Sequence, residues 1–205
     1  MGLWRCGMHD IDEQVRQVWL AAQDPAVTAQ LEAIYAKVSE EIAARGPACW
    51  ASGRCCNFRK AGHDLFVTLL EAAYCVQRAN RQAEHARENG AFVSEQDAAS
   101  KSRDVSLPQA SSSAGAGANT LSIAAIDAAR ERGDCPYLDG NLCGAHGIKP
   151  LGCRVYFCDA TAQDWQHELT ERALRHIRAL HEQFSVPYVY DEWRRQLARC
   201  VSPAR

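Results

Sequence analysis

Cysteine is the residue type in this chain with the most chemistry to offer. The sequence has ten cysteines among 205 residues, and seven of them lie in two short windows. The first window holds Cys49, Cys55 and Cys56, and the second holds Cys135, Cys143, Cys153 and Cys158. Adjacent cysteines are poor disulfide partners, because a bridge would strain the backbone between them. In a reducing compartment, clustered cysteines are more often metal ligands or catalytic groups.

Thiolates bind zinc, iron and iron–sulfur clusters. Because a single loop seldom surrounds an ion, we expect both windows to contribute to one site. The sulfurs expected to approach one another are those of Cys55, Cys56, Cys135, Cys143 and Cys153. A tetrahedral zinc takes four ligands, so seven candidates leave a surplus. Either a second metal or cluster is present, or some thiols support the ligands or take part in redox chemistry.

Three glycines suit loops of this kind. Gly53, Gly140 and Gly152 can adopt backbone conformations that other residues avoid. Tight turns also supply the N–H donors that ligand thiolates need.

The other three cysteines are interpreted differently. Cys75 lies in a helical pattern among apolar residues and is expected to pack as a small hydrophobe. Cys6 and Cys200 lie near the termini and are not expected to take part in the site.

The two windows together resemble the zinc- or iron-chelating cysteine-cluster family, also called the CxxCxxCC or YkgJ-type family. The family's first motif, Cys-x-x-Cys-x-x-Cys-Cys, aligns with Cys49 to Cys56, and Ser52 stands where the second cysteine belongs. The second motif resembles Cys-Pro-Phe-Leu, a turn, a cysteine, Arg-Pro and Cys-Arg. Here it reads "CPYLDGNLCGAHGIKPLGCR", with Lys149 in place of the arginine.

The resemblance implies a zinc or iron site, including an iron–sulfur cluster, held by the cysteines of both windows. A serine hydroxyl is a poor substitute for a thiolate, so Ser52 is not expected to be a ligand. The flagellin lysine methylases are similar in their cysteine motif. Their activity is not carried over, because this chain lacks a Gly-rich strand-to-helix signature for a nucleotide-like cofactor.

Other polar residues in the second window have weaker claims to a role in the site. His146 follows Cys143 at ligand spacing, but the family usually has an aromatic residue there, so it is either a ligand or a loop histidine. Asp139 is expected to form a turn, and Arg154 is expected to support the site.

The predicted fold class is mainly α, a helical domain around a cysteine-rich loop core with a small β-hairpin. Helix start signals occur at Asp10 to Glu13, Asp24-Pro25 and Thr68 to Glu71, where each acid or threonine can cap a helix. Further helices are expected from Ile123 to Gly133, from after Cys158 to Ser185, and from about Tyr190 to Ala198. A strand is expected at Leu65 to Val67, and a hairpin around Asp139-Gly140.

The expected domain organisation has three parts. Residues 1–46 form an N-terminal helical arm, residues 47–160 the cysteine-cluster domain, and residues 161–205 C-terminal helices packed on it. Within the second part, a stretch rich in Ser, Ala and Gly at about 91–119 is expected to be a flexible insertion that metal binding does not need.

The overall composition and charge give no reason to expect nucleic acid or a membrane as a partner. The net charge is −2, with 47% hydrophobic and 23% charged residues, so bulk charge does not favour nucleic acid or an anionic membrane. The first residues, "MGLWRCGMHD", lack the apolar run of a secretory signal, and a cytoplasmic protein is expected. Three functions compete: a metal-binding protein, an enzyme using the site for redox or protein-modifying chemistry, and a helical interaction module with a protein partner.

Overall fold

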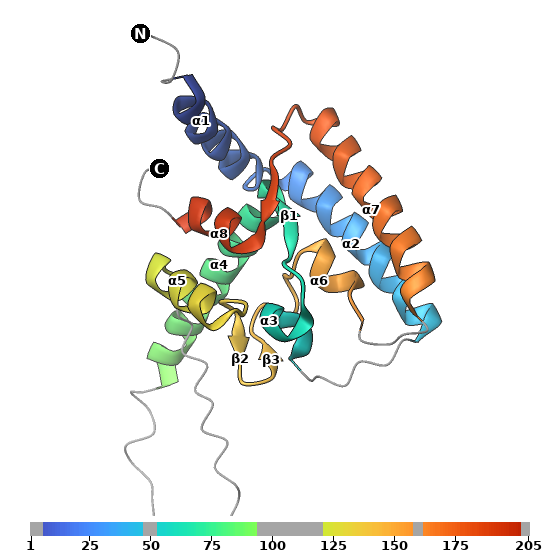
Figure 1. The fold of residues 1–205 in the computed structure, drawn as a ribbon. Coiled ribbons are helices and arrows are strands. Elements are labelled where there is room, and N and C mark those ends of the chain that lie inside the picture. Colours follow the sequence, from blue (N-terminus) through green and yellow to red (C-terminus); the bar gives the residue numbers. More distant parts are fainter. Residues whose placement is uncertain (1–5, 47–52, 94–120, 158–161, 202–205) are drawn as a thin grey trace, which may run out of the picture.

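The computed structural model describes residues 6–46, 53–93, 121–157 and 162–201, and in these the chain is mainly helical, as predicted (Figure 1). Two small antiparallel sheets, each of two strands, accompany the helices. The helices are α1 (Cys6–Ala21), α2 (Pro25–Arg45), α3 (Phe58–Ala61), α4 (Leu69–Val93), α5 (Ile123–Arg132), α6 (Leu151–Val155), α7 (Gln163–Gln183) and α8 (Trp193–Val201), with a 3-10 turn η1 (Arg54–Cys56). The strands are β1 (Phe66–Thr68), β2 (Leu138–Asp139), β3 (Leu142–Cys143) and β4 (Tyr190–Glu192).

Helix α2 begins and ends where the sequence predicts. The Asp24 carboxylate accepts a hydrogen bond from the backbone N–H of Ala26, and Pro25 occupies the first turn. Gly46 ends the helix with a positive φ of 59°. The apolar stripe of α2 packs against α7, and the two helices run side by side (Figure 1).

The capping box at the start of α4 is also confirmed. The backbone N–H of Glu71 donates to the hydroxyl of Thr68, and the Glu71 carboxylate accepts from the backbone N–H of Thr68. Thr68 is the last residue of β1, so the chain turns directly from a strand into the longest helix. Helix α4 packs on α1 and on α8.

Strand β4 corrects the prediction of a helix from Tyr190 to Ala198. Residues Tyr190–Glu192 pair with β1, Phe66 lying opposite Glu192, and the helix starts only at Trp193. The pairing of β4 with a strand distant in sequence outweighs local helical propensity here. The predicted hairpin is confirmed, since β2 pairs with β3 around Asp139-Gly140.

Several bounds differ from those predicted. Helix α1 begins at Cys6 and not at Asp10. A capping residue marks a preferred start only, and no proline between the two positions stops the helix. The short elements η1, α3 and α6 within the cysteine loops were not predicted. Helix α4 continues to Val93, into the predicted insertion, whose remainder lies outside the described residues.

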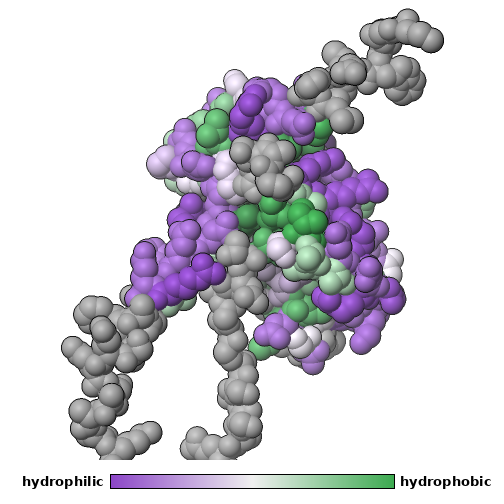
Figure 2. Space-filling view, turned by 90° about the vertical axis from the view of Figure 1, so that its left-hand side faces the viewer, coloured by the Kyte–Doolittle hydropathy of each residue, from purple (hydrophilic) through white to green (hydrophobic). Residues whose placement is uncertain are grey.

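Buried residues from all three predicted parts of the chain form one connected hydrophobic cluster. It is built mainly from α2, α4, α7 and α8. The hydrophobic stripe of α7 is buried, as shown by Leu169, Ala173, Ile177 and Leu180. The face seen in Figure 2 carries an apolar patch bordered by polar side chains. Among the described helices, none combines the length and apolar character that crossing a membrane requires.

Candidate metal centre

Two backbone hydrogen bonds join the segments that carry the two cysteine windows. The N–H of Cys135 donates to the carbonyl oxygen of Cys56 over 2.8 Å, and the N–H of Arg59 donates to the carbonyl oxygen of Gly133 over 2.9 Å. Each bond pairs a backbone donor with a backbone acceptor. The arrangement places η1 and α3 directly against the start of the second window.

Gly53 allows a further close approach between the windows. Its φ is 67°, and a Cβ built on it would lie 2.9 Å from the Cα of Asn141 at the tip of the β2–β3 hairpin. Glycine is therefore required by both conformation and space. Gly140 has a φ of 57°, as expected of a hairpin turn. Gly152 was expected to adopt an unusual backbone conformation too, but its φ is not positive. Gly152 instead lies close to a neighbouring side chain, since a Cβ built on it would lie 2.5 Å from Leu65 Cδ1, which would have to move.

The thiol of Cys56 lies among three other thiols. Its sulfur is 4.0 Å from that of Cys55, and it also interacts with the thiols of Cys135 and Cys143. Cys56 and Cys135 are buried, Cys143 is half-buried, and Cys55 is exposed. The fold thus gathers four sulfurs from both windows into a cluster with one solvent-facing side.

The thiols of this cluster differ in their pKa. Hydrogen bonding with Cys135, Cys143 and Cys55, together with burial, raises the pKa of Cys56 far above the ordinary value. The hydrogen bond from Cys56 lowers the pKa of Cys55 to about 6 and that of Cys143 to about 7. In the metal-free protein, Cys55 and Cys143 therefore lose their protons more readily than Cys56 does.

Further donors around the cluster stabilise the charged sulfurs. The backbone N–H of Ala145 hydrogen-bonds to the Cys143 sulfur, and the backbone of Cys55 and Cys56 does the same for Cys55. The ammonium of Lys149 also lowers the pKa of both Cys55 and Cys143. Lys149 therefore supplies a positive charge where the resemblance expected an arginine.

Cys153 reaches the cluster on α6. Burial and the charges of Cys135 and Cys143 raise the pKa of Cys153 well above the ordinary value. The Cys153 thiol is close enough to Cys135 and Cys143 to interact with them electrostatically, but it forms no hydrogen bond to either. The five described cysteines of the two windows therefore lie in one region of the molecule.

A buried carboxylate anchors the helix that carries Cys153. Glu71 is 1% exposed and accepts from the backbone N–H of Leu151, the first residue of α6, over 2.8 Å. The same carboxylate accepts from the Tyr35 hydroxyl over 3.1 Å and from the Thr68 hydroxyl over 3.0 Å. The Arg154 guanidinium lies 4.2 Å from the centroid of the Tyr35 ring. Glu71 thus connects α2, α4 and α6.

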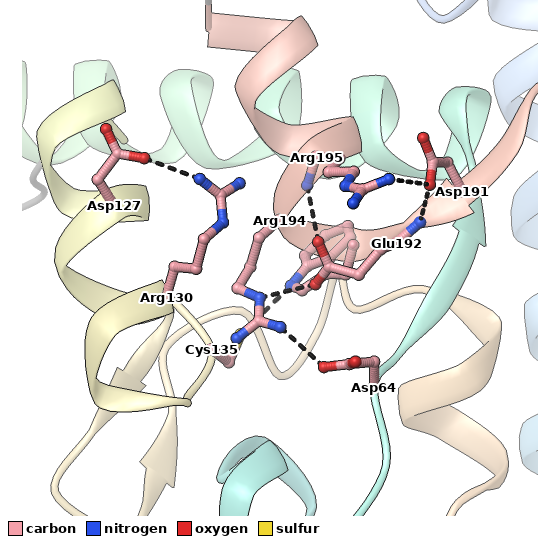
Figure 3. Close-up of polar contacts among 9 residues, drawn as sticks. Asp64, Asp127, Arg130, Cys135, Asp191, Glu192, Arg194 and Arg195 are labelled. Atoms are coloured by element: carbon pink, nitrogen blue, oxygen red, sulfur yellow. Dashed lines mark hydrogen bonds and ion pairs between the residues drawn. The ribbon is translucent and has the colours of Figure 1, made fainter.

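Trp193 and an ion-pair cluster support the site from α8. The Trp193 indole N–H donates to the Cys135 sulfur over 3.3 Å. Next to it, the buried guanidinium of Arg194 lies between the carboxylates of Glu192 and Asp64, at 2.7 and 2.8 Å (Figure 3). These contacts fix the start of α8 relative to the second window.

Sequence reasoning missed two of these supporting residues. The capping box identified Glu71 as a helix-start residue but gave no sign that its carboxylate also holds α6. Trp193 was placed inside a predicted helix, and no local signal links it to Cys135, because the contact depends on how α8 packs.

Other candidate residues differ in their placement. Cys49, Ser52 and Cys158 lie outside the described residues. Cys75 is buried in α4, as predicted, and Cys200, predicted to be spare, is also buried in the core. The His146 side chain is exposed.

Thiol groups are the donors that thiophilic metal ions prefer. Two thiolates bound to a tetrahedral zinc at about 2.3 Å would lie about 3.8 Å apart, close to the 4.0 Å between Cys55 and Cys56. Across residues 6–46, 53–93, 121–157 and 162–201, however, no three His, Cys, Asp or Glu side chains are arranged as a formed metal site. The described sulfurs are gathered together without surrounding one point.

Comparison of the chain with protein-family models, curated proteins and solved structures finds no match in any of the three.

Proposed function

We propose that this is a metal-binding protein that holds zinc or iron, including an iron–sulfur cluster, through the cysteines of its two windows. The observation that carries the proposal is the contact of the Cys56 thiol with Cys55 in its own window and with Cys135 and Cys143 in the other. Four sulfurs that meet in this way, with N–H donors around them, match the chemistry of soft metal sites.

The ligands are drawn from the seven cysteines of the windows. Cys55, Cys56, Cys135 and Cys143 are the first candidates, and Cys153, Cys49 and Cys158 supply the remaining thiols. Metal binding would displace the proton that Cys56 shares with its neighbours, since ligand thiols bind as thiolates. We assign the protein to a reducing compartment such as the cytoplasm, where free thiols of this kind persist.

The proposal is tested by metal analysis of the full chain purified without air. We expect a sub-stoichiometric to stoichiometric amount of zinc or iron, with a brown colour if an iron–sulfur cluster is present. Cys56→Ser should lower the metal content strongly, whereas Cys75→Ala, which removes a core thiol outside the windows, should leave it unchanged. Wild-type protein without zinc or iron, and unable to take up either, would refute the proposal.

An enzyme that uses the cysteines directly is the second candidate. The observation in its favour is that Cys55 is exposed and has its pKa lowered to about 6, which are properties of reactive cysteines. Rapid, selective alkylation of Cys55 in the metal-loaded protein would favour this candidate, because a ligand thiolate is shielded by its metal. We do not extend the proposal to an interaction module, because the apolar stripe of α7 is buried in the core.

A further inference from the structure

Trp193 lies outside both windows but is hydrogen-bonded to a window sulfur. Its indole Nε1–H donates to Cys135 Sγ over 3.3 Å. Trp193 is 1% exposed and Cys135 is 4% exposed, so water does not compete for the bond. A buried indole N–H normally has an acceptor, and here that acceptor is a sulfur.

The acceptor strength of that sulfur depends on its charge. A neutral thiol is a weak acceptor, whereas a hydrogen bond to an ionised group is roughly twice as strong as a neutral one. A cysteine binds a metal as its thiolate, so the Trp193 N–H would donate to a stronger acceptor once a metal is bound.

Trp193 is also held in place before any metal binds. Its backbone N–H donates to the carbonyl oxygen of Leu65 over 2.8 Å, and its ring lies 6.2 Å from that of Tyr137. The next residue, Arg194, is fixed by its ion pairs with Glu192 and Asp64 (Figure 3). The indole donor thus stands in position without a rearrangement of α8.

We infer that Trp193 is a positioning residue for the metal centre, whose indole N–H holds the Cys135 sulfur in place for the metal and draws electron density away from it. This inference rests on the proposed function. Outer groups that hydrogen-bond to metal ligands tune ligand basicity and metal affinity. The buried sulfur of Cys135 therefore becomes the firmly held, less reactive side of the site, and the exposed Cys55 becomes the accessible side.

The test compares cobalt(II)-loaded proteins by absorption spectroscopy and by competition for the metal. Trp193→Phe removes the N–H and keeps an aromatic ring, and Trp19→Phe in α1 is the matched control. We expect Trp193→Phe to shift the sulfur-to-cobalt charge-transfer band to lower energy and to weaken cobalt affinity about 10- to 100-fold. Trp19→Phe should leave both unchanged. If Trp193→Phe folds poorly, benzothienylalanine at position 193, which keeps the ring shape and lacks the N–H, replaces it.

The outcomes separate the inference from the proposed function. A wild-type band that neither variant at position 193 alters would overturn the inference alone. Wild-type protein that binds neither cobalt(II) nor an iron–sulfur cluster would overturn both. If the purified protein carries a cluster, the same variants are compared by reduction potential. Loss of an N–H···S bond should lower that potential, and an unchanged potential would overturn the inference.

Discussion

The backbone N–H of Cys135 donates to the carbonyl oxygen of Cys56 over 2.8 Å, so the two cysteine windows are joined at the residues that carry the sulfurs. The bond sets the register between the loops, and both side chains consequently point into the same cluster. Changes to the backbone around this contact should therefore affect metal binding even where no cysteine is altered.

Replacement of Gly53 by alanine tests that dependence. The left-handed backbone costs a non-glycine residue roughly 1–2 kcal/mol, and the added Cβ would lie 2.9 Å from the Asn141 Cα. We expect Gly53→Ala to lower the free energy of unfolding by about 2 kcal/mol or more and to reduce metal content, because the hairpin must move away from η1.

Gly46→Ala is the matched control for Gly53→Ala. Gly46 also has a positive φ, of 59°, but nothing lies within 4 Å of the place that an added Cβ would occupy. In this variant the free energy of unfolding should fall only by the cost of the left-handed backbone, roughly 1–2 kcal/mol, and the metal content should not change. Denaturant unfolding and metal analysis measure both effects. Equal metal contents in the two variants would contradict the proposed role of the Gly53–Asn141 contact.

Glu71→Gln should be strongly destabilising. The carboxylate of Glu71 accepts from Leu151, Tyr35 and both donors of Thr68, and a glutamine side chain would turn an NH₂ group towards some of these donors. Leaving buried donors unsatisfied costs about 1–3 kcal/mol each. We expect a loss of about 3 kcal/mol, measured by denaturant unfolding, with weaker metal binding because α6 carries Cys153.

Glu32→Gln provides the comparison for Glu71. Glu32 pairs with Arg78 and accepts from the Tyr74 hydroxyl, but its side chain is 43% exposed. A partly exposed ion pair contributes about 0–1 kcal/mol, so this variant should be nearly as stable as the wild type. If Glu71→Gln were no less stable than Glu32→Gln, the buried carboxylate would not be an anchor for α6.

Local signals predicted the parts of the fold that depend on neighbouring residues. Asp24-Pro25 and Gly46 gave both ends of α2, and the Thr68 to Glu71 capping box gave the start of α4. The same signals could not find β4, since Tyr190–Glu192 forms a strand only because β1 lies beside it.

For the candidate site, the sequence predicted that thiols of the two windows lie together but not which residues support them. The clustering of the cysteines was visible from their spacing. The contacts of Trp193 with Cys135 and of Glu71 with Leu151 join residues far apart in the chain. Such contacts arise from helix packing, for which a single sequence offers no local pattern.

The reactivity of Cys55 should depend on pH in the reduced, metal-free protein. Its pKa is lowered to about 6, mainly by the hydrogen bond from Cys56 and to a smaller degree by Lys149. Alkylation of Cys55 should therefore rise with pH with a midpoint near 6. Because the folded chain holds this proton less tightly than the unfolded chain, the free energy of unfolding should rise with pH between about 6 and the ordinary value of 9.0.

Two variants separate the causes of the lowered Cys55 pKa. Cys56→Ala removes the hydrogen-bond donor and should move the alkylation midpoint well towards 9.0. Lys149→Met removes only the smaller contribution and should move it less. Rates are followed by peptide mapping and mass spectrometry. A midpoint that stays near 6 in Cys56→Ala would show that the thiol pair is not the cause.

Ser52 is the last residue for which the resemblance and the chemistry make a definite prediction. In the resemblance drawn from the sequence it aligns with a cysteine of the family motif, and it lies outside the described residues. A hydroxyl is a poor ligand for zinc or iron, and the windows already hold more thiols than the four ligands of a zinc ion or a cubane cluster. Ser52→Ala should therefore keep its metal, and Ser52→Cys should be tolerated.

Cys55→Ser and Cys153→Ser provide the contrast with the Ser52 variants. Binding energy at such a site is also folding energy, so both cysteine variants should lose metal and melt at a lower temperature. Metal content and thermal melting are compared across all four proteins. If Ser52→Ala lost its metal as fully as Cys55→Ser, the hydroxyl would be a ligand or an essential hydrogen-bond donor. The alignment of Cys49 to Cys56 with the family motif would then be a poor guide to how this site binds its metal.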